Sequence, residues 1–296
     1  MNKEYEFKMK AMGTECFISI ISNDEVKAGV LGVQALNTIK EYEKKFSRFL
    51  PDSELSKLNE KKEMNVSREF MEVISEAFML YKKTKGIFNP LVQIERFGYD
   101  KTYTELTPQD TPIDLCYDID FDSVKIDIEN NKITLADCQK LDFGGVLKGY
   151  LAEKIAQNII ENESVSGVIV NLGGDICTRG LDEHNRKFIF SIYNPVNPDK
   201  NEPVEIFNQS LATSGTYKRV WDRSGNKINH ILNKSGTGNT DSGTISASII
   251  HESGSSAEAF AKVFLSLPIK DVNVLFAESK IKYITITESG VVNKNI

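Results

Sequence analysis

The chain has 296 residues, 40% of them apolar, a formal net charge of −6 and a sequence pI near 5.4. A chain of this length and composition can bury a substantial core. Because it carries no broad basic field, the composition argues against nucleic acid and anionic membrane surfaces as general partners. A small molecule or another protein is the favoured partner.

Neither a membrane span nor a cysteine motif is predicted. No window supplies about 18 uninterrupted apolar residues, and the N-terminal stretch has no apolar segment of the signal-peptide kind. The chain as given is therefore expected in the cytoplasm, or outside it if a leader has been removed. Its four cysteines form no CxxC pair, so we expect reduced, partly buried thiols. They are Cys16, Cys116, Cys138 and Cys177.

The first half of the chain shows a strand, two helices and a hairpin. Residues 15–22 are rich in β-branched and aromatic residues, which is typical of a strand. Residues 25–46 predict a helix, and residues 67–85 a second one that Ser67 caps and Gly86 ends. The proposed apolar face of the first helix consists of Val26, Val30, Val33, Leu36, Ile39 and Tyr42. A polar loop is expected over 102–111, and a hairpin over 123–136.

The second half alternates strands and helices irregularly. A surface helix is expected from Tyr150 to Glu161, and a further helix, with no face assigned, over 255–267. Strands are expected at residues 166–175, 188–195, 245–250 and 282–287. This irregular order predicts an α+β architecture with mixed sheets and not a doubly wound one.

One glycine turn, "LDFGGVLKGY" at residues 141–150, stands directly before a helix. Its glycines let the backbone approach a ligand closely, and amides at a helix start can face an anion. The spacing fits neither a dinucleotide fold nor a P-loop. From the residues alone, a phosphate site and an ordinary strand-to-helix turn with a solvated lysine both stay open.

Seven further stretches form an ordered set with this turn. The set of eight reads "AMGT" at 11–14, "FSRFLPDSELSKLN" at 46–59, "GIFNPLVQIERFG" at 86–98, "LDFGGVLKGYLAEKIA" at 141–156, "VNLGGDI" at 170–176, "LATSGTYKR" at 211–219, "NHILN" at 229–233 and "SGSSAEAFAKVFLSL" at 253–267. In this order and spacing the chain resembles the FAD:protein FMN transferases, the ApbE family.

The resemblance implies a fold and a reaction. The fold is a tandem of T-fold-like α+β halves with mixed or antiparallel sheets and a flavin site between them, so residues 1–296 are expected to form one ApbE-like domain of two intertwined subdomains. The reaction splits FAD at its pyrophosphate, passes FMN to a Thr or Ser hydroxyl of a target flavoprotein and releases AMP. A non-catalytic or weakly active FAD-binding homologue with a degenerate metal site is the alternative.

The resemblance also assigns roles to residues. The positions that match flavin contacts are Met12, Phe49, Ile87, Phe88, Asn89, Asp142, Lys148 and Ile231. Phe49 stands where relatives often have Tyr, and Asn89 replaces a frequent Asp. His230 and Lys148 are the implied catalytic residues: His230 to hold or protonate a phosphate oxygen, Lys148 to meet a phosphate as a charged donor. Replacement of Lys148 is expected to weaken FAD binding with little loss of the fold.

The implied Mg²⁺ site departs from the family pattern. Its three positions are occupied here by Gly145, Glu258 and Lys262. Glu258 keeps an oxygen that can ligate a metal. The charged ammonium of Lys262 can only donate hydrogen bonds and has no lone pair with which to ligate a metal. Three interpretations remain: Lys262 takes over part of the metal's work, Lys262 turns to solvent while Glu258 and backbone carbonyls still hold Mg²⁺, or the chain is an inactive transferase that still binds FAD.

Overall fold

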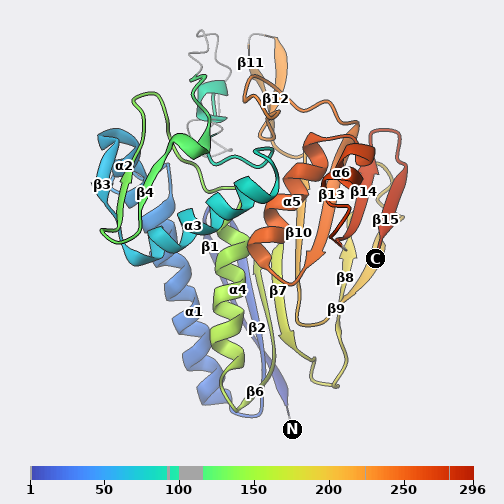
Figure 1. Cartoon of the computed structure of the whole chain (residues 1–296). Helices are drawn as coiled ribbons and strands as arrows, with labels where there is room; N and C mark the ends of the chain where they lie inside the picture. The colour runs from blue at the N-terminus through green and yellow to red at the C-terminus, as the bar shows by residue number, and fades with distance from the viewer. Residues whose placement is uncertain (1, 92–93, 100–115, 224, 280) are drawn as a thin grey trace.

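An eight-stranded sheet, antiparallel at every pairing, forms the centre of the computed structural model (Figure 1). The structure describes all residues except 1, 92–93, 100–115, 224 and 280. In spatial order the strands are β1 (Lys3–Ala11), β2 (Thr14–Ser22), β6 (Val165–Leu172), β7 (Asp175–Gly180), β10 (Ser210–Gly215), β13 (Thr244–His251), β14 (Lys282–Thr287) and β15 (Val292–Asn295). The expected α+β class with antiparallel sheets is confirmed, and the doubly wound alternative is excluded.

Both faces of this sheet are covered. Helices α1 (Glu25–Phe46), α4 (Leu147–Ile160) and α5 (Gly254–Ser266) lie on one face, against β1–β2, β6–β7 and β10–β13 respectively (Figure 1). The hairpin of β8 (Phe188–Ile192) and β9 (Glu202–Ile206) packs on the other. Neighbouring residues of β13 face opposite sides of the sheet: Ile249 packs in the core on the helix side, and Ile250 packs in the core on the hairpin side.

Smaller elements surround one end of the sheet. They are α2 (Glu54–Lys61), β3 (Glu63–Asn65), α3 (Arg68–Lys83), η1 (Ile94–Phe97), η3 (Phe121–Ser123), β4 (Lys125–Asp127), β5 (Lys132–Thr134), β11 (Val220–Arg223), β12 (Asn226–Asn229) and α6 (Ile269–Leu275). The predicted hairpin over 123–136 is present as β4 and β5. Ser67 caps α3 as predicted, by accepting a hydrogen bond from the Phe70 amide.

Helix α1 has the predicted bounds, but its predicted apolar face is wrong in the first half. Val26, Val30 and Val33 are 78%, 48% and 55% exposed. The buried positions there are small residues: Ala28, Gly32 and Ala35. A Cβ at Gly32 would lie 2.4 Å from the ring of Phe7, so close approach to strand β1 decides which face turns inward.

The cysteine prediction is half wrong. Cys116 and Cys138 form a disulfide, whereas Cys16 and Cys177 are buried free thiols as expected. The predicted polar loop over 102–111 lies outside the described residues.

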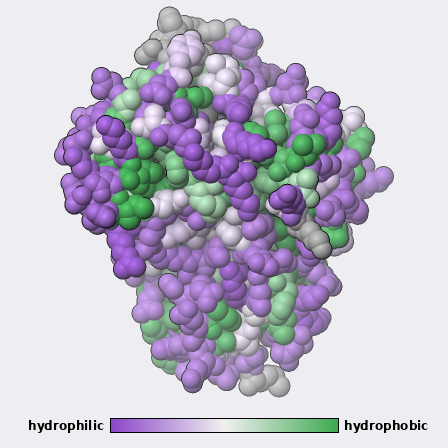
Figure 2. All heavy atoms as spheres, viewed as in Figure 1, coloured by the Kyte–Doolittle hydropathy of each residue, from purple (hydrophilic) through white to green (hydrophobic). Residues whose placement is uncertain are grey.

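The surface is mainly polar on the face seen in Figure 2, with apolar side chains in scattered patches. Across the described ranges, no helix combines the length and apolar character that crossing a bilayer requires.

Candidate functional site

The glycine turn leads directly into α4 and is fixed by local hydrogen bonds. The Asp142 carboxylate accepts a hydrogen bond of 2.7 Å from the Gly144 amide, and the Asp142 amide donates to the Pro90 carbonyl at 2.8 Å. The Val146 amide closes the turn on the Phe143 carbonyl. No described strand leads directly into this turn, since β5 ends at Thr134, but these hydrogen bonds order its backbone before the first turn of α4.

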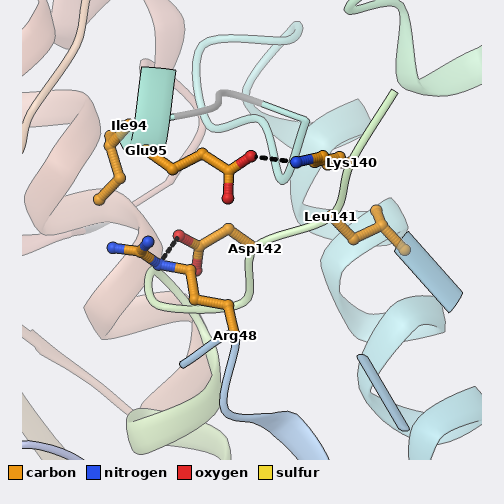
Figure 3. A pocket seen from close by; sticks show the side chains of 6 residues that line it. All are labelled: Arg48, Ile94, Glu95, Lys140, Leu141 and Asp142. Atoms are coloured by element: carbon orange, nitrogen blue, oxygen red, sulfur yellow. Dashed lines mark hydrogen bonds and ion pairs between the residues drawn. The ribbon is translucent and has the colours of Figure 1, made fainter. Parts of the chain in front are cut away.

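A small pocket opens beside this turn (Figure 3). Its lining residues are Arg48, Ile94, Glu95, Lys140, Leu141 and Asp142. The Arg48 guanidinium is 3.1 Å from the Asp142 carboxylate, and Lys140 pairs with Glu95 at 2.6 Å (Figure 3). Asp142, a predicted flavin contact, therefore lines a pocket but is already paired with a cation.

Aromatic rings flank Arg48. Its guanidinium carbon lies 4.2 Å from the ring centre of Phe49 and 4.9 Å from that of Tyr99. Phe49 is 38% exposed, so its ring is accessible for stacking with a planar ligand. Trp221 packs against Tyr99 from the β11–β12 hairpin, which brings distant parts of the chain to this end of the molecule.

A close crossing of α4 and α5 builds the centre of the site. Any side chain larger than a hydrogen atom would clash there: a Cβ at Gly149 would lie 2.1 Å from the Gly254 carbonyl oxygen and 3.1 Å from the Cβ of Glu258. The Gly149 amide donates a hydrogen bond of 2.9 Å to the Glu258 carboxylate. Two glycines at the crossing thus place Glu258 of α5 beside Lys148 of α4.

Four charged side chains meet at this crossing. Lys148 pairs closely with Asp175 and lies 3.4 Å from Glu258, and Lys262 lies 3.4 Å from the same Glu258 oxygen. We call Lys148, Asp175, Glu258 and Lys262 the charge cluster. Its two positive and two negative charges balance.

The acids of the charge cluster are buried and its lysines are not. The side chains of Glu258 and Asp175 are 0% and 5% exposed, while those of Lys148 and Lys262 are 22% and 21% exposed. Burial raises the pKa of Glu258, but the ammonium groups of Lys148 and Lys262 outweigh burial and hold that pKa below its ordinary value. Glu258 is therefore ionised at neutral pH.

His230 follows β12 and belongs electrostatically to the same site. Burial and the charges of Arg219 and Lys262 lower the pKa of His230 to about 3. Its Nδ1 atom is buried and has no hydrogen-bond partner among the described residues. The imidazole is therefore neutral at pH 7, with one nitrogen unused by the protein.

Two tight turns support the site from the β1–β2 and β6–β7 hairpins. Met12 has a positive φ of 54° in the first turn, and its amide donates to the Glu43 carboxylate of α1. In the second turn, Gly173 and Gly174 have φ of 69° and 100° and lead into Asp175 of the charge cluster.

The remaining predicted flavin positions lie in packed surroundings. Phe88 is 5% exposed, Ile231 is 4% exposed, and Ile87 is half-buried against the same core. The Asn89 amide group donates to the Ile119 carbonyl and its oxygen accepts from the Leu91 amide, so this side chain orders its own loop. Their contacts with flavin stay predictions.

The residues at the expected Mg²⁺ site do not fit that ion. Mg²⁺ is held by oxygen ligands in octahedral geometry, but one Glu258 oxygen faces two ammonium groups and the other accepts the Gly149 amide. The stem of Lys262 also lies against Gly145, because a Cβ there would be 3.1 Å from its Cδ atom. Outside the undescribed segments, no three His, Cys, Asp or Glu side chains are grouped to hold a metal ion.

Sequence reasoning did not assign Asp175, Arg48, Glu43 or Arg219 to the site. Asp175 carried a signal, since it directly follows the glycine pair of "VNLGGD". Arg48 and Arg219 lie within quoted stretches, but their roles, like that of Glu43, depend on contacts between distant segments: Arg48 with Asp142, Glu43 with the Met12 turn and Arg219 with His230.

Solved structures share this fold. A flavin transferase ApbE from Vibrio cholerae superposes with a TM-score of 0.81 at 18% identity, covering 100% of this chain and 97% of that one. The ApbE protein from Thermotoga maritima gives a TM-score of 0.82 at 22% identity, covering 99% and 97%.

Sequence comparisons agree with the fold. A protein named FAD:protein FMN transferase from Haemophilus influenzae is 24% identical over an alignment of 242 positions, which covers 75% of this chain and 68% of that protein. One of the same name from Escherichia coli is 22% identical over an alignment of 303 positions, which covers 95% of this chain and 83% of that protein. The model of the ApbE family matches residues 12–285. This chain therefore belongs to the ApbE family.

Proposed function

We propose that the protein transfers FMN from FAD to a Thr or Ser hydroxyl of a target flavoprotein and releases AMP. The observation that carries this proposal is the grouping of Lys148, Lys262, Arg219 and neutral His230 around the glycine turn. Relatives named FAD:protein FMN transferase support the reaction class.

The lysines supply the anion-binding part of the site. Lys148 stands in the first turn of α4, near the positive end of the helix dipole. Phosphoryl transfer depends mainly on positioning and on stabilising charge on the phosphoryl oxygens, and ammonium groups serve both. We place the FAD pyrophosphate against Lys148 and Lys262.

The flavin ring is assigned to the aromatic side of the site. Phe49 presents an exposed ring for stacking, and Asp142 lies next to it across Arg48. Met12 is held in a strained turn by Glu43 at the end of the β1–β2 hairpin. These contacts would fix the orientation of FAD before the acceptor hydroxyl arrives.

The transfer step breaks one bond and forms one. The acceptor hydroxyl oxygen attacks the phosphorus of the FMN half; the P–O bond to AMP breaks, and its electron pair leaves on the AMP phosphate oxygen. His230 accepts the hydroxyl proton, because its neutral imidazole has a free nitrogen. The bound pyrophosphate raises the low pKa of His230 by offsetting the positive charges of Arg219 and Lys262.

Mass spectrometry tests the proposal. The protein is mixed with FAD and acceptor peptides that carry an Asp, a pair of small residues and a terminal Thr. We expect a covalent mass increment of FMN on the peptide, lost when the Thr is replaced by Val and strongly reduced in His230→Gln. Retained FAD without any increment on peptides or whole flavoproteins would instead identify a non-catalytic FAD-binding homologue.

A further inference from the structure

Lys262 lies where a divalent cation would be expected, and its geometry suggests a different solution. We infer that the Lys262 ammonium is a built-in cation, so that the chain binds the FAD pyrophosphate without a divalent metal. This inference rests on the proposed function, because it concerns the phosphate end of the same FAD site.

The position of Lys262 is fixed by its own helix and by the glycine turn. Its Nζ atom lies 3.4 Å from a Glu258 carboxylate oxygen and 3.3 Å from the Glu258 carbonyl, one helical turn earlier. The stem packs against Gly145, where a Cβ would lie 3.1 and 3.2 Å from its Cδ and Cε atoms. A side chain held in this way presents its charge at a defined place and loses little freedom when an anion binds.

The charge cluster presents its positive side outward. Glu258 and Asp175 are buried beneath the lysines, and Lys148 and Lys262 keep about a fifth of their side-chain surface exposed. An anion that approaches the glycine turn therefore meets two ammonium groups before it meets a carboxylate. Arg219 adds positive charge, because its field reaches both Lys148 and His230.

The same arrangement opposes a divalent ion. A metal at Glu258 would have to displace Lys262 and enter beside Lys148, and both ammonium groups would repel it. Glu258 is the single carboxylate among the three expected ligand positions, and its oxygens already have partners. The ammonium and the metal are therefore alternatives at this place.

Two titrations test the inference on the full-length protein. FAD binding is measured by fluorescence quenching in EDTA and in excess Mg²⁺, and Mn²⁺ binding is measured by electron paramagnetic resonance without FAD. The variants are Lys262→Thr, which offers a hydroxyl ligand, and Lys262→Met, which keeps the apolar stem without the charge. Lys270→Thr, an exposed site on α6, is the matched control.

For wild type and Lys270→Thr we expect equal FAD affinity in EDTA and Mg²⁺ and no Mn²⁺ binding at micromolar concentrations. Lys262→Thr and Lys262→Met should lose about 10- to 100-fold in FAD affinity in EDTA, as expected for loss of a charge-assisted contact. Only Lys262→Thr should regain affinity with Mg²⁺ and bind Mn²⁺.

Two results would overturn the inference and leave the proposed function intact. One is a wild-type FAD affinity that falls tenfold or more in EDTA together with tight Mn²⁺ binding. The other is full FAD affinity of Lys262→Met in EDTA. Failure of wild type to bind FAD under both conditions would instead reject the proposed function.

Discussion

Replacement of Lys148 by Met should destabilise the folded protein as well as weaken FAD binding. The sequence alone suggested little loss of the fold, but the structure shows that Lys148 neutralises two carboxylates that are 0% and 5% exposed. Removing one partner of a buried ion pair costs about 3–5 kcal/mol, because the other charge stays buried. Since Lys262 still faces Glu258, we expect the lower end, about 3 kcal/mol.

The matched control is Lys154→Met on the same helix. Lys154 pairs with Glu72 at 2.8 Å, and both side chains are 33% exposed, so its loss should cost about 1 kcal/mol or less. Urea unfolding followed by circular dichroism at pH 7, without FAD, measures both variants. Adding Asp175→Asn to Lys148→Met should recover part of the loss. Equal stability of the two single variants would refute the argument from buried charge.

Three further expectations follow from other features. Gly29→Ala should stabilise α1 by about 0.5–1 kcal/mol because nothing lies within 4 Å of the new Cβ, whereas Gly32→Ala should lower the melting temperature because its Cβ meets the Phe7 ring. A change in stability of the same sign for both variants would contradict the packing described. The folded-state pKa of His230, about 3, lies below its unfolded value, so the folded protein binds fewer protons and its free energy of unfolding should fall as pH drops below about 6.5. His230→Gln should flatten this pH dependence in urea titrations between pH 7 and 4, and an unchanged slope would contradict the prediction. The segment 241–247, which partly imitates an acceptor but has Ala247 at the Thr position, should take no FMN, and an adduct in the intact mass after incubation with FAD and Mg²⁺ would show otherwise.

Local signals in the sequence were sufficient to predict most of the long helices and strands. Helix α1 has the predicted bounds because the Asp24 side chain caps its first turn and no proline interrupts residues 25–46. The inward face of α1 was not predictable from hydrophobicity, since the fit of Gly32 against Phe7 is a tertiary contact. Strand β1 was missed although "KEYEFKMKA" alternates polar and apolar residues, because its many charges lie on the outward face.

The sequence predicted several residues of the site but not how these residues are arranged in space. Family resemblance placed Lys148, Glu258 and Lys262, yet their meeting depends on the glycine crossing of α4 and α5. Asp175 joins them from strand β7, which lies 25 residues or more beyond the glycine turn in the sequence. The Cys116–Cys138 disulfide was missed for the same reason, because sequence spacing does not reveal which thiols become neighbours.

The direction of strand β1 has a practical consequence for handling the protein. Its nine residues run from Lys3 toward the Met12 turn, so a group attached before Lys3 would be about 30 Å from that turn at 3.4 Å per residue (Figure 1). A biotin or fluorescent label fused there would lie at the end of the molecule opposite the glycine turn. Immobilisation on a biosensor through this end would leave the site facing the solution, where capture of FAD and of acceptor proteins can be followed directly.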